Sequence, residues 1–122
     1  MDVRVKTENV VRDKSFALAL RMVKLSGYLQ KDKKEFVLSK QIMRSGTAIG
    51  ALIREAEHAE SRADFRHKMN IALKEANETL YWLDLLHQSG FLTDEEYGSV
   101  FPDAEEVLKV LVSIVKKLKS EN

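Results

Sequence analysis

Apolar residues recur every three or four positions through almost the whole chain, and this spacing constrains the fold more than any other feature. A repeat near 3.6 residues turns one side of an α-helix toward a core, whereas a half-buried strand alternates at every second residue. One proline and five glycines interrupt the 122 residues, and Ala, Leu, Lys and Glu are frequent. The sequence therefore predicts an all-α fold.

Four helices are expected, at about residues 10–30, 33–57, 62–88 and 102–119. Residues with capping-box spacing mark three helical starts, at Asp32, Ser61 and Thr93, the last of them capping one short turn. Gly90 is a stop signal for the third helix, and Pro102 suits the first turn of the fourth. Short connections make consecutive helices neighbours, so we expect one domain over residues 1–122, an antiparallel up-down-up-down four-helix bundle.

The composition excludes several classes of protein. There is no cysteine, which rules out disulfides, thiolate metal sites and a cysteine nucleophile, and fits a reducing compartment. No stretch resembles a signal peptide or approaches the ~20 apolar residues of a membrane span. We expect a soluble, cytoplasmic protein without a membrane partner.

Charge is unevenly distributed although the net charge is only +1. Residues 1–50 hold 11 Lys/Arg and 5 Asp/Glu, whereas residues 51–122 hold 9 and 14. One part of the surface is therefore expected to be electropositive, unless these are ordinary solvated helix faces.

The first and third helices each carry a second apolar stripe. On the first, we assign Phe16, Ala19, Leu20, Val23 and Gly27 to the core. Apolar residues also lie on the opposite side of the first helix and away from the core stripe of the third helix. Something other than this core must shield them from water. We predict that they form the interface of a homo-oligomer: Leu18, Met22, Leu25, Leu29, Ile71, Trp82 and Leu85. The amino-terminal arm or the 90–101 connection are alternative covers within one chain.

Two glycines four residues apart interrupt the second helix in the stretch "RSGTAIGALIREA". Each costs roughly 1 kcal/mol relative to alanine inside a helix. Together with Ser39, Gly46 and Gly50 form a ridge of small residues that lets a neighbouring helix approach closely. The alternative is that Gly50 is simply tolerated on an exposed face.

No arrangement of residues indicates catalysis. A di-iron bundle needs carboxylates and histidines pointing into the core, whereas Glu55 with His58 and Asp64 with His67 point away from it. There is no serine triad, and no phosphate loop follows a strand. We expect no metal, no cofactor, no small-molecule substrate and no enzymatic activity.

Binding is the remaining class of function. Arginines gather around the second helix and its turn into the third, and further cations lie on the first helix. Guanidinium groups suit phosphate, so these residues are candidates for nucleic-acid contact: Arg12, Lys14, Arg21, Lys24, Arg44, Arg54, Arg62 and Arg66. The alternative is ion pairing with interleaved acids such as Glu55, Glu57 and Glu60.

The stretches "QIMRSGTAIGALIREA", "SRADF" and "IALKEANET" identify a resemblance that covers about residues 14–119. The chain resembles the bacterial four-helix bundle proteins named after reading frames within 23S rRNA intervening sequences. The same fold family includes the accessory variability determinant of diversity-generating retroelements, a pentameric barrel that associates with a reverse transcriptase and nucleic acid.

This resemblance implies a homopentamer around a central channel. It also implies binding of RNA or single-stranded DNA, or of a reverse transcriptase or ribonucleoprotein, through basic residues such as Arg12, Lys14, Arg21, Lys24, Arg44 and Arg54. The family supplies no catalytic residues. The leading hypothesis is a non-enzymatic oligomer that binds RNA or a ribonucleoprotein. The alternative is a protein scaffold or adaptor without a nucleic-acid role.

Overall fold

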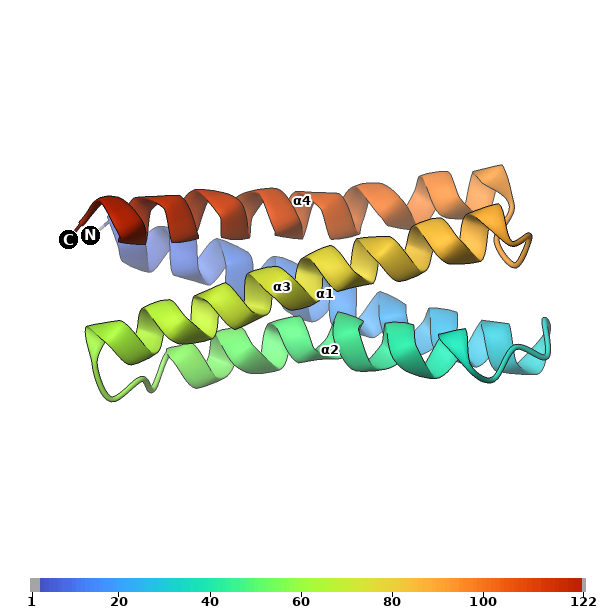
Figure 1. Ribbon diagram of the computed structural model, residues 1–122, viewed down its shortest axis with the longest axis horizontal. Helices are drawn as coiled ribbons and strands as arrows, with labels where there is room; N and C mark the ends of the chain where they lie inside the picture. Colours follow the sequence, from blue (N-terminus) through green and yellow to red (C-terminus); the bar gives the residue numbers. More distant parts are fainter. Residues whose placement is uncertain (1–2, 122) are drawn as a thin grey trace.

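Four helices account for most of the chain in the computed structural model, which describes residues 3–121 and the side chains of residues 10–121. They are α1 (Val3–Lys31), α2 (Leu38–Ala56), α3 (Arg62–Gln88) and α4 (Asp94–Ser120). Short turns join them at alternate ends of an elongated bundle (Figure 1). The described residues contain no strand. The all-α prediction is confirmed, and the arrangement fits an up-down-up-down bundle.

Local capping signals fix the turn into α3 and the start of α4. The Ser61 hydroxyl accepts a hydrogen bond from the Asp64 N–H, and Thr93 and Glu96 form a complete capping box. Gly90 follows α3 with φ of 86°, a left-handed conformation that glycine adopts at little cost. These three predicted signals lie where the sequence placed them.

Helix α2 begins at Leu38, five residues later than predicted. Lys34 has φ of 56°, outside the helical region, so the chain cannot continue as a helix from residue 33. Glu35 is buried, and its carboxylate accepts hydrogen bonds from the N–H groups of Val37 and Ser39. The acidic side chain thus supplies the cap of α2 in place of Asp32.

Helix α4 begins eight residues earlier than predicted and runs through Pro102 without a break. The capping box at Thr93 therefore starts the long helix itself, and no separate short turn precedes it. Pro102 lacks the N–H that would bond to the Gly98 carbonyl, so it removes one hydrogen bond from the helix. Helix α1 is also longer than predicted, beginning at Val3.

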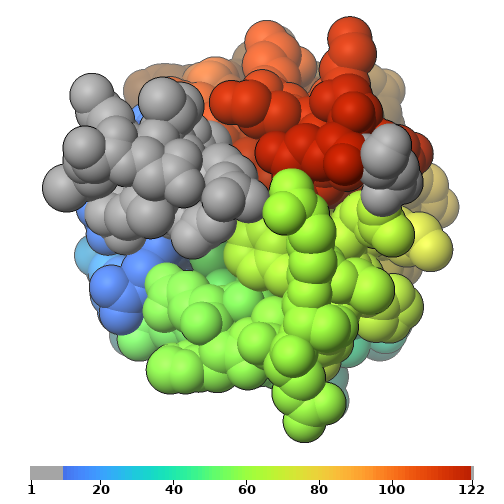
Figure 2. Space-filling view, turned by 90° about the vertical axis from the view of Figure 1, so that its left-hand side faces the viewer, coloured from blue at the N-terminus to red at the C-terminus, as the bar shows by residue number. Residues whose placement is uncertain are grey.

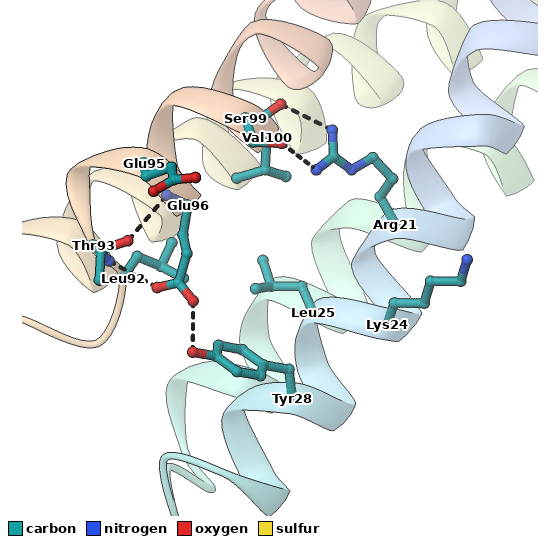
Figure 3. A pocket seen from close by; sticks show the side chains of 10 residues that line it. All are labelled: Arg21, Lys24, Leu25, Tyr28, Leu92, Thr93, Glu95, Glu96, Ser99 and Val100. Atoms are coloured by element: carbon teal, nitrogen blue, oxygen red, sulfur yellow. Dashed lines mark hydrogen bonds between the residues drawn. The ribbon is translucent and has the colours of Figure 1, made fainter.

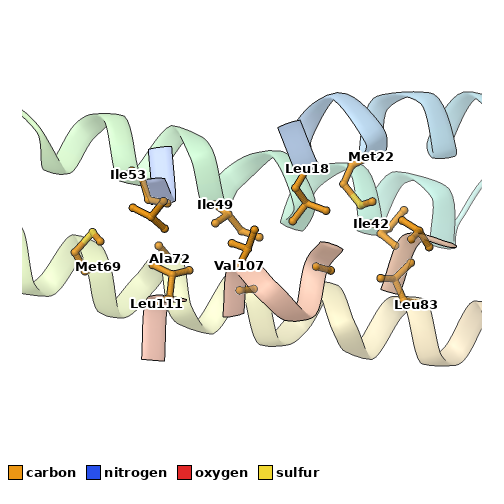
Figure 4. Close-up of a cluster of buried hydrophobic side chains, with 14 of the residues drawn as sticks. Leu18, Met22, Ile42, Ile49, Ile53, Met69, Ala72, Leu83, Val107 and Leu111 are labelled. Carbon is orange, nitrogen blue, oxygen red and sulfur yellow. The ribbon is translucent and has the colours of Figure 1, made fainter. Parts of the chain in front are cut away.

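The core runs along the bundle axis and is built from all four helices (Figure 4). Its side chains are mainly Leu, Ile, Val, Met and Ala. Serine and threonine side chains lie where neighbouring helices contact each other. Between α1 and α2, Ser26 Oγ donates to the Ser39 carbonyl at 3.0 Å, and between α2 and α3, Thr79 Oγ1 lies 3.0 Å from Ser45 Oγ. These buried polar groups have partners, as a stable core requires.

The two apolar stripes of α1 are the reverse of the prediction. Leu18, Met22 and Leu29, predicted to face another subunit, are 2%, 0% and 0% exposed and belong to the core. Leu25 packs against that core. Phe16, Leu20 and Val23, predicted as core, are 47 to 52% exposed. Both stripes have helical spacing, but only the Leu18 stripe meets Ile42 and Ile49 of α2 (Figure 4).

The glycine ridge of α2 faces α1 within the bundle. A Cβ placed on Gly46 would overlap the Met22 side chain, lying 2.9 Å from its Cβ atom. A Cβ on Gly50 would lie 3.5 Å from the Ser15 carbonyl oxygen, an ordinary contact. The predicted close approach is therefore confirmed at Gly46, where the neighbour is a side chain, and Gly50 does not require glycine.

The α1/α4 seam is the loosest of the four seams between helices. At the end that Figure 2 views, the α2–α3 turn lies beside the last residues of α4, and Arg62 forms an ion pair with Glu121 there. Both α1–α2 and α3–α4 turns lie at the opposite end (Figure 1).

Candidate functional site

An apolar strip faces solvent along α1 and α2. We define the α1/α2 strip as Phe16, Leu20, Val23 and Met43, each 40 to 52% exposed. Phe16, Leu20 and Val23 lie one helical turn apart on α1. Met43 belongs to α2, whose register against α1 is marked by the Ser26–Ser39 hydrogen bond and the contact of Gly46 with Met22. Exposed apolar residues that are contiguous mark a surface for another macromolecule.

Arg54 borders this strip. Its guanidinium carbon lies 5.1 Å from the centre of the Phe16 ring, within range of a cation–π interaction. On the same seam, Arg12 Nε lies 3.0 Å from Glu57 Oε1, close enough for an ion pair but without hydrogen-bond alignment. Two predicted nucleic-acid residues are thus already engaged inside the molecule.

Two more predicted residues bridge α1 to α4. Lys14 Nζ lies 2.7 Å from a carboxylate oxygen of Glu106. Arg21 donates to Asp103 at 2.7 Å, and to the carbonyl and hydroxyl oxygens of Ser99 at 2.9 and 3.0 Å. These side chains tie together the seam that has the least helix packing.

Arg44 lies on a third seam, between α2 and α3. It donates to Glu75 at 2.9 Å and also to Glu78, which accepts a hydrogen bond from Trp82 Nε1 at 3.1 Å. Burial raises the pKa of Glu75, and so does its hydrogen bond with Glu78. Together these effects are larger than the lowering of that pKa by Arg44. Burial would also raise the pKa of Glu78, but its bonds to Arg44 and Trp82 lower it.

The predicted basic residues therefore do not gather on one face. Arg62 pairs with Glu121 at the end of the bundle, and Arg66 also has an interaction within the molecule. Of the eight, Lys24 alone has no interaction with a residue that the structure describes. Ion pairing explains most of the set, although the partners are often acids of other helices, such as Asp103 and Glu75, instead of Glu55 or Glu60.

The predicted interface residues on α3 are half-buried. Trp82 packs against the core, and Ile71 and Leu85 are also partly covered. Their role between subunits stays a prediction.

A hollow of about 710 Å³ opens where α1 and α4 diverge (Figure 3). Leu25, Leu92 and Val100 supply its apolar lining, and Arg21 is bonded to Ser99 at its edge. Tyr28 Oη donates to Glu96 at 2.5 Å across it. This hydrogen bond raises the pKa of Tyr28. Because its main polar groups already bond to one another, the hollow offers few free groups to a ligand.

Histidines do not form a metal centre among the described side chains, where no group of three potential ligands gathers. His87 instead lies 2.7 Å from Asp94 and stacks on Tyr97 at 4.2 Å. Burial and a hydrogen bond to Asp84 raise the pKa of Tyr97 to about 12. These residues join the end of α3 to the start of α4.

The charge asymmetry of the sequence becomes a difference between two layers. Residues 1–50, with their excess of cations, form α1 and most of α2. The acidic remainder forms α3 and α4, which pack against each other and make up the opposite layer of the bundle. The α1/α2 strip thus lies on the more basic side.

Comparison with known proteins agrees with the bundle. The family described as 23S rRNA-intervening sequence protein matches residues 7–113. The chain belongs to this family. A crystal structure from Bacteroides thetaiotaomicron, described as a protein of unknown function from the S23 ribosomal protein family, is 58% identical. The match covers 90% of this chain and 98% of that one, with a TM-score of 0.88.

No curated protein matches the chain. The family matches do not extend to the retroelement determinant, so that part of the resemblance stays an expectation. No helix among the described residues is long and apolar enough to cross a membrane.

Sequence reasoning placed a turn between α1 and α2 but missed its full length and the apolar residues in it. Phe36 and Val37 are exposed there, next to Lys31, Lys34 and Lys40. A signal existed in the stretch "KDKKEFV", where two apolar residues follow a run of lysines, but assigning residue 33 to a helix concealed it.

Proposed function

We propose that the protein is a non-enzymatic homo-oligomer whose copies together bind RNA or a ribonucleoprotein in the cytoplasm. The observation that carries this proposal is the α1/α2 strip, whose four large apolar side chains face solvent in the single chain. Burying such a surface between copies removes apolar area from water, which is favourable by roughly 25 cal/mol for each Å².

The opposite charges of the two layers support a head-to-tail contact. In this arrangement the basic α1/α2 layer of one copy meets the acidic α3/α4 layer of the next, where Tyr81 and Val112 are also exposed. A contact between two different faces generates a ring when the rotation closes. The resemblance to pentameric relatives suggests that this ring has five copies.

Membership in a family named after 23S rRNA intervening sequences supports the RNA component. Most of the predicted arginines are engaged inside the molecule, so we assign the contact instead to exposed lysines without ion pairs to described residues. On α1 and α2 these are Lys24, Lys31 and Lys40. A ring repeats these cations in every copy, so weak contacts add through multivalency.

The second candidate is a protein scaffold or adaptor. The pairing of Arg12 with Glu57 and of Lys68 with Glu55 favours it, because paired cations are less available to phosphate. In that case a protein partner would be recovered from cell extract after nuclease treatment, and purified protein would not bind RNA.

Oligomerisation is tested by light scattering coupled to size exclusion. We expect the wild-type protein to have a mass that is a multiple of 14.0 kDa, and Leu20→Glu to shift the mass toward one chain. Leu20 is 52% exposed, so the helical circular dichroism should be unchanged. Ala63→Glu, which adds the same charge at an exposed position in the first turn of α3, at the end of the bundle, is the matched control and should keep the wild-type mass. A wild-type mass of a single chain would overturn the assembly.

A further inference from the structure

The turn of residues 32–37 between α1 and α2 exposes two adjacent apolar side chains. Phe36 is 51% exposed. Val37 is 69% exposed, which is the highest value among the large apolar side chains described. Neither belongs to the core or packs against it. An aromatic ring that is half exposed and outside the core, in the turn between two helices, is available to a partner.

The backbone beneath these side chains is held in place. The buried Glu35 carboxylate accepts hydrogen bonds from the Val37 N–H at 3.2 Å and the Ser39 N–H at 2.8 Å. The Glu35 N–H donates to the Leu29 carbonyl at 2.9 Å. Burial raises the pKa of Glu35, but the backbone hydrogen bonds together lower that pKa by more than burial raises it. The net pKa is therefore below its ordinary value, and the carboxylate remains charged and anchored. Phe36 is therefore presented on a preorganised turn, which reduces the entropy lost on binding.

Lysines are frequent in the turn and in the residues that flank it. Residues 31–40 contain four lysines, against Asp32 and the internally bonded Glu35. Lys31, Lys34 and Lys40 are exposed and pair with no described residue. Lys33 Nζ lies 5.9 Å from the centre of the Tyr28 ring. The turn thus combines free ammonium groups with an unpartnered aromatic face.

We propose that residues 31–40 bind single-stranded nucleic acid, with Phe36 stacked on an unpaired base and Lys31, Lys34 and Lys40 on the flanking phosphates. This rests on the proposed RNA-binding function and assigns its site. Proteins that grip single strands combine these two elements, because every base has a face to stack and every linkage a negative charge. A duplex would keep its bases inside the stack, so unpaired RNA is the expected ligand.

The surroundings of the turn favour a strand over an anionic membrane. The α3–α4 turn lies at the same end of the bundle and leads into Asp94 and Glu95 (Figure 1). A flat anionic bilayer facing this end would approach those carboxylates as well as the lysines. A single strand is narrow enough to follow the α1/α2 side alone.

Binding is measured by fluorescence anisotropy with a labelled single-stranded oligouridine and the full-length protein. We expect Phe36→Leu and Phe36→Ala to weaken binding by roughly tenfold, the typical loss for one stacked base, and Phe36→Trp to preserve it. Lys34→Gln should lower the slope of log affinity against log salt by about 0.7. Val10→Ala, which truncates an exposed apolar side chain of α1 outside both the turn and the α1/α2 strip, is the control and should bind like wild type.

Each other outcome overturns the assignment in a distinguishable way. Salt-dependent RNA binding that Phe36→Leu leaves unchanged would remove this site while the proposed function stands. No wild-type binding at low salt would remove both. Anionic vesicles bound equally by wild type and Phe36→Leu, with RNA unbound, would indicate a lipid surface. A change of particle mass in Phe36→Ala would show that a second copy covers the turn.

Discussion

Gly46 and Gly50 are alike in the sequence but differ in their surroundings. Gly46 is buried against Met22, whose side chain occupies the space where a Cβ would lie. Gly50 has room for a methyl group at ordinary contact distance from Ser15. Glycine is required at the first position, and at the second it costs helix stability without an evident steric return.

We predict that Gly46→Ala destabilises the protein by about 1 to 3 kcal/mol, because the added methyl overpacks the α1/α2 seam. Gly50→Ala should be neutral or stabilise by up to about 1 kcal/mol, from helix propensity alone. Urea unfolding followed by circular dichroism measures both changes. Equal effects of the two substitutions would contradict this account of the seam.

At the scale of residues, the sequence predicts contacts that are local and misses those that are not. Ser61, Gly90 and Thr93 act within three or four positions of themselves, so their roles follow from spacing. The partners of Arg21 and Arg44 come from other helices, and no spacing rule identifies Asp103 or Glu75.

Among the helices, α1 shows why the sequence could not choose a core face. The Leu18 and Phe16 stripes both repeat at intervals of three and four, so both satisfy the amphipathic pattern. In the structure the Leu18 stripe is the longer of the two. It extends from Val11 to Leu29 through buried Ser15 and Ser26, and it is the stripe that forms the core. Serines inside the stripe made it look less apolar than it is in the structure.

The start of α2 depends on a charged side chain. Hydrogen bonds hold the pKa of Glu35 below its ordinary 4.5 in the folded protein. The contribution of this carboxylate to folding stability is therefore fully present above pH 4.5. It is lost as pH falls through the lower folded value. Part of the stability that the protein loses in acid should therefore come from the loss of these hydrogen bonds at the start of α2.

We expect Glu35→Gln to reduce stability by about 1 kcal/mol near neutral pH, as loss of a cap does. The difference from wild type should vanish at acid pH, where Glu35 is protonated in both folded and unfolded chains. Urea midpoints across the pH range measure it. Glu60→Gln, at an exposed position, serves as control, and a wild-type advantage that persists in acid would refute the role of this carboxylate.

Across the whole molecule, the α1/α4 seam is held more by polar side chains than by packing. Lys14, Arg21 and Tyr28 each reach across it to α4. Exposed ion pairs contribute at most about 1 kcal/mol, so this seam should be the first to open.

We predict that Tyr28→Phe, which removes the hydroxyl bonded to Glu96, increases amide hydrogen exchange several-fold in the last turns of α1 and the first turns of α4. Exchange in the α2–α3 seam should be unchanged, because its hydroxyl contact between Ser45 and Thr79 is remote. Mass spectrometry of exchanged peptides distinguishes the two regions. Uniform acceleration would indicate global destabilisation instead.

Val3 and Ser120 lie at the pole of the bundle opposite the 32–37 turn (Figure 1). A helix as long as α1 separates the poles by roughly 40 Å. A fluorophore or bead attached beside either of these residues therefore stands well clear of Phe36, and molecules immobilised in this way point the lysine-rich hairpin into solution. Single-molecule and surface-based assays can use such tethers without obstructing it.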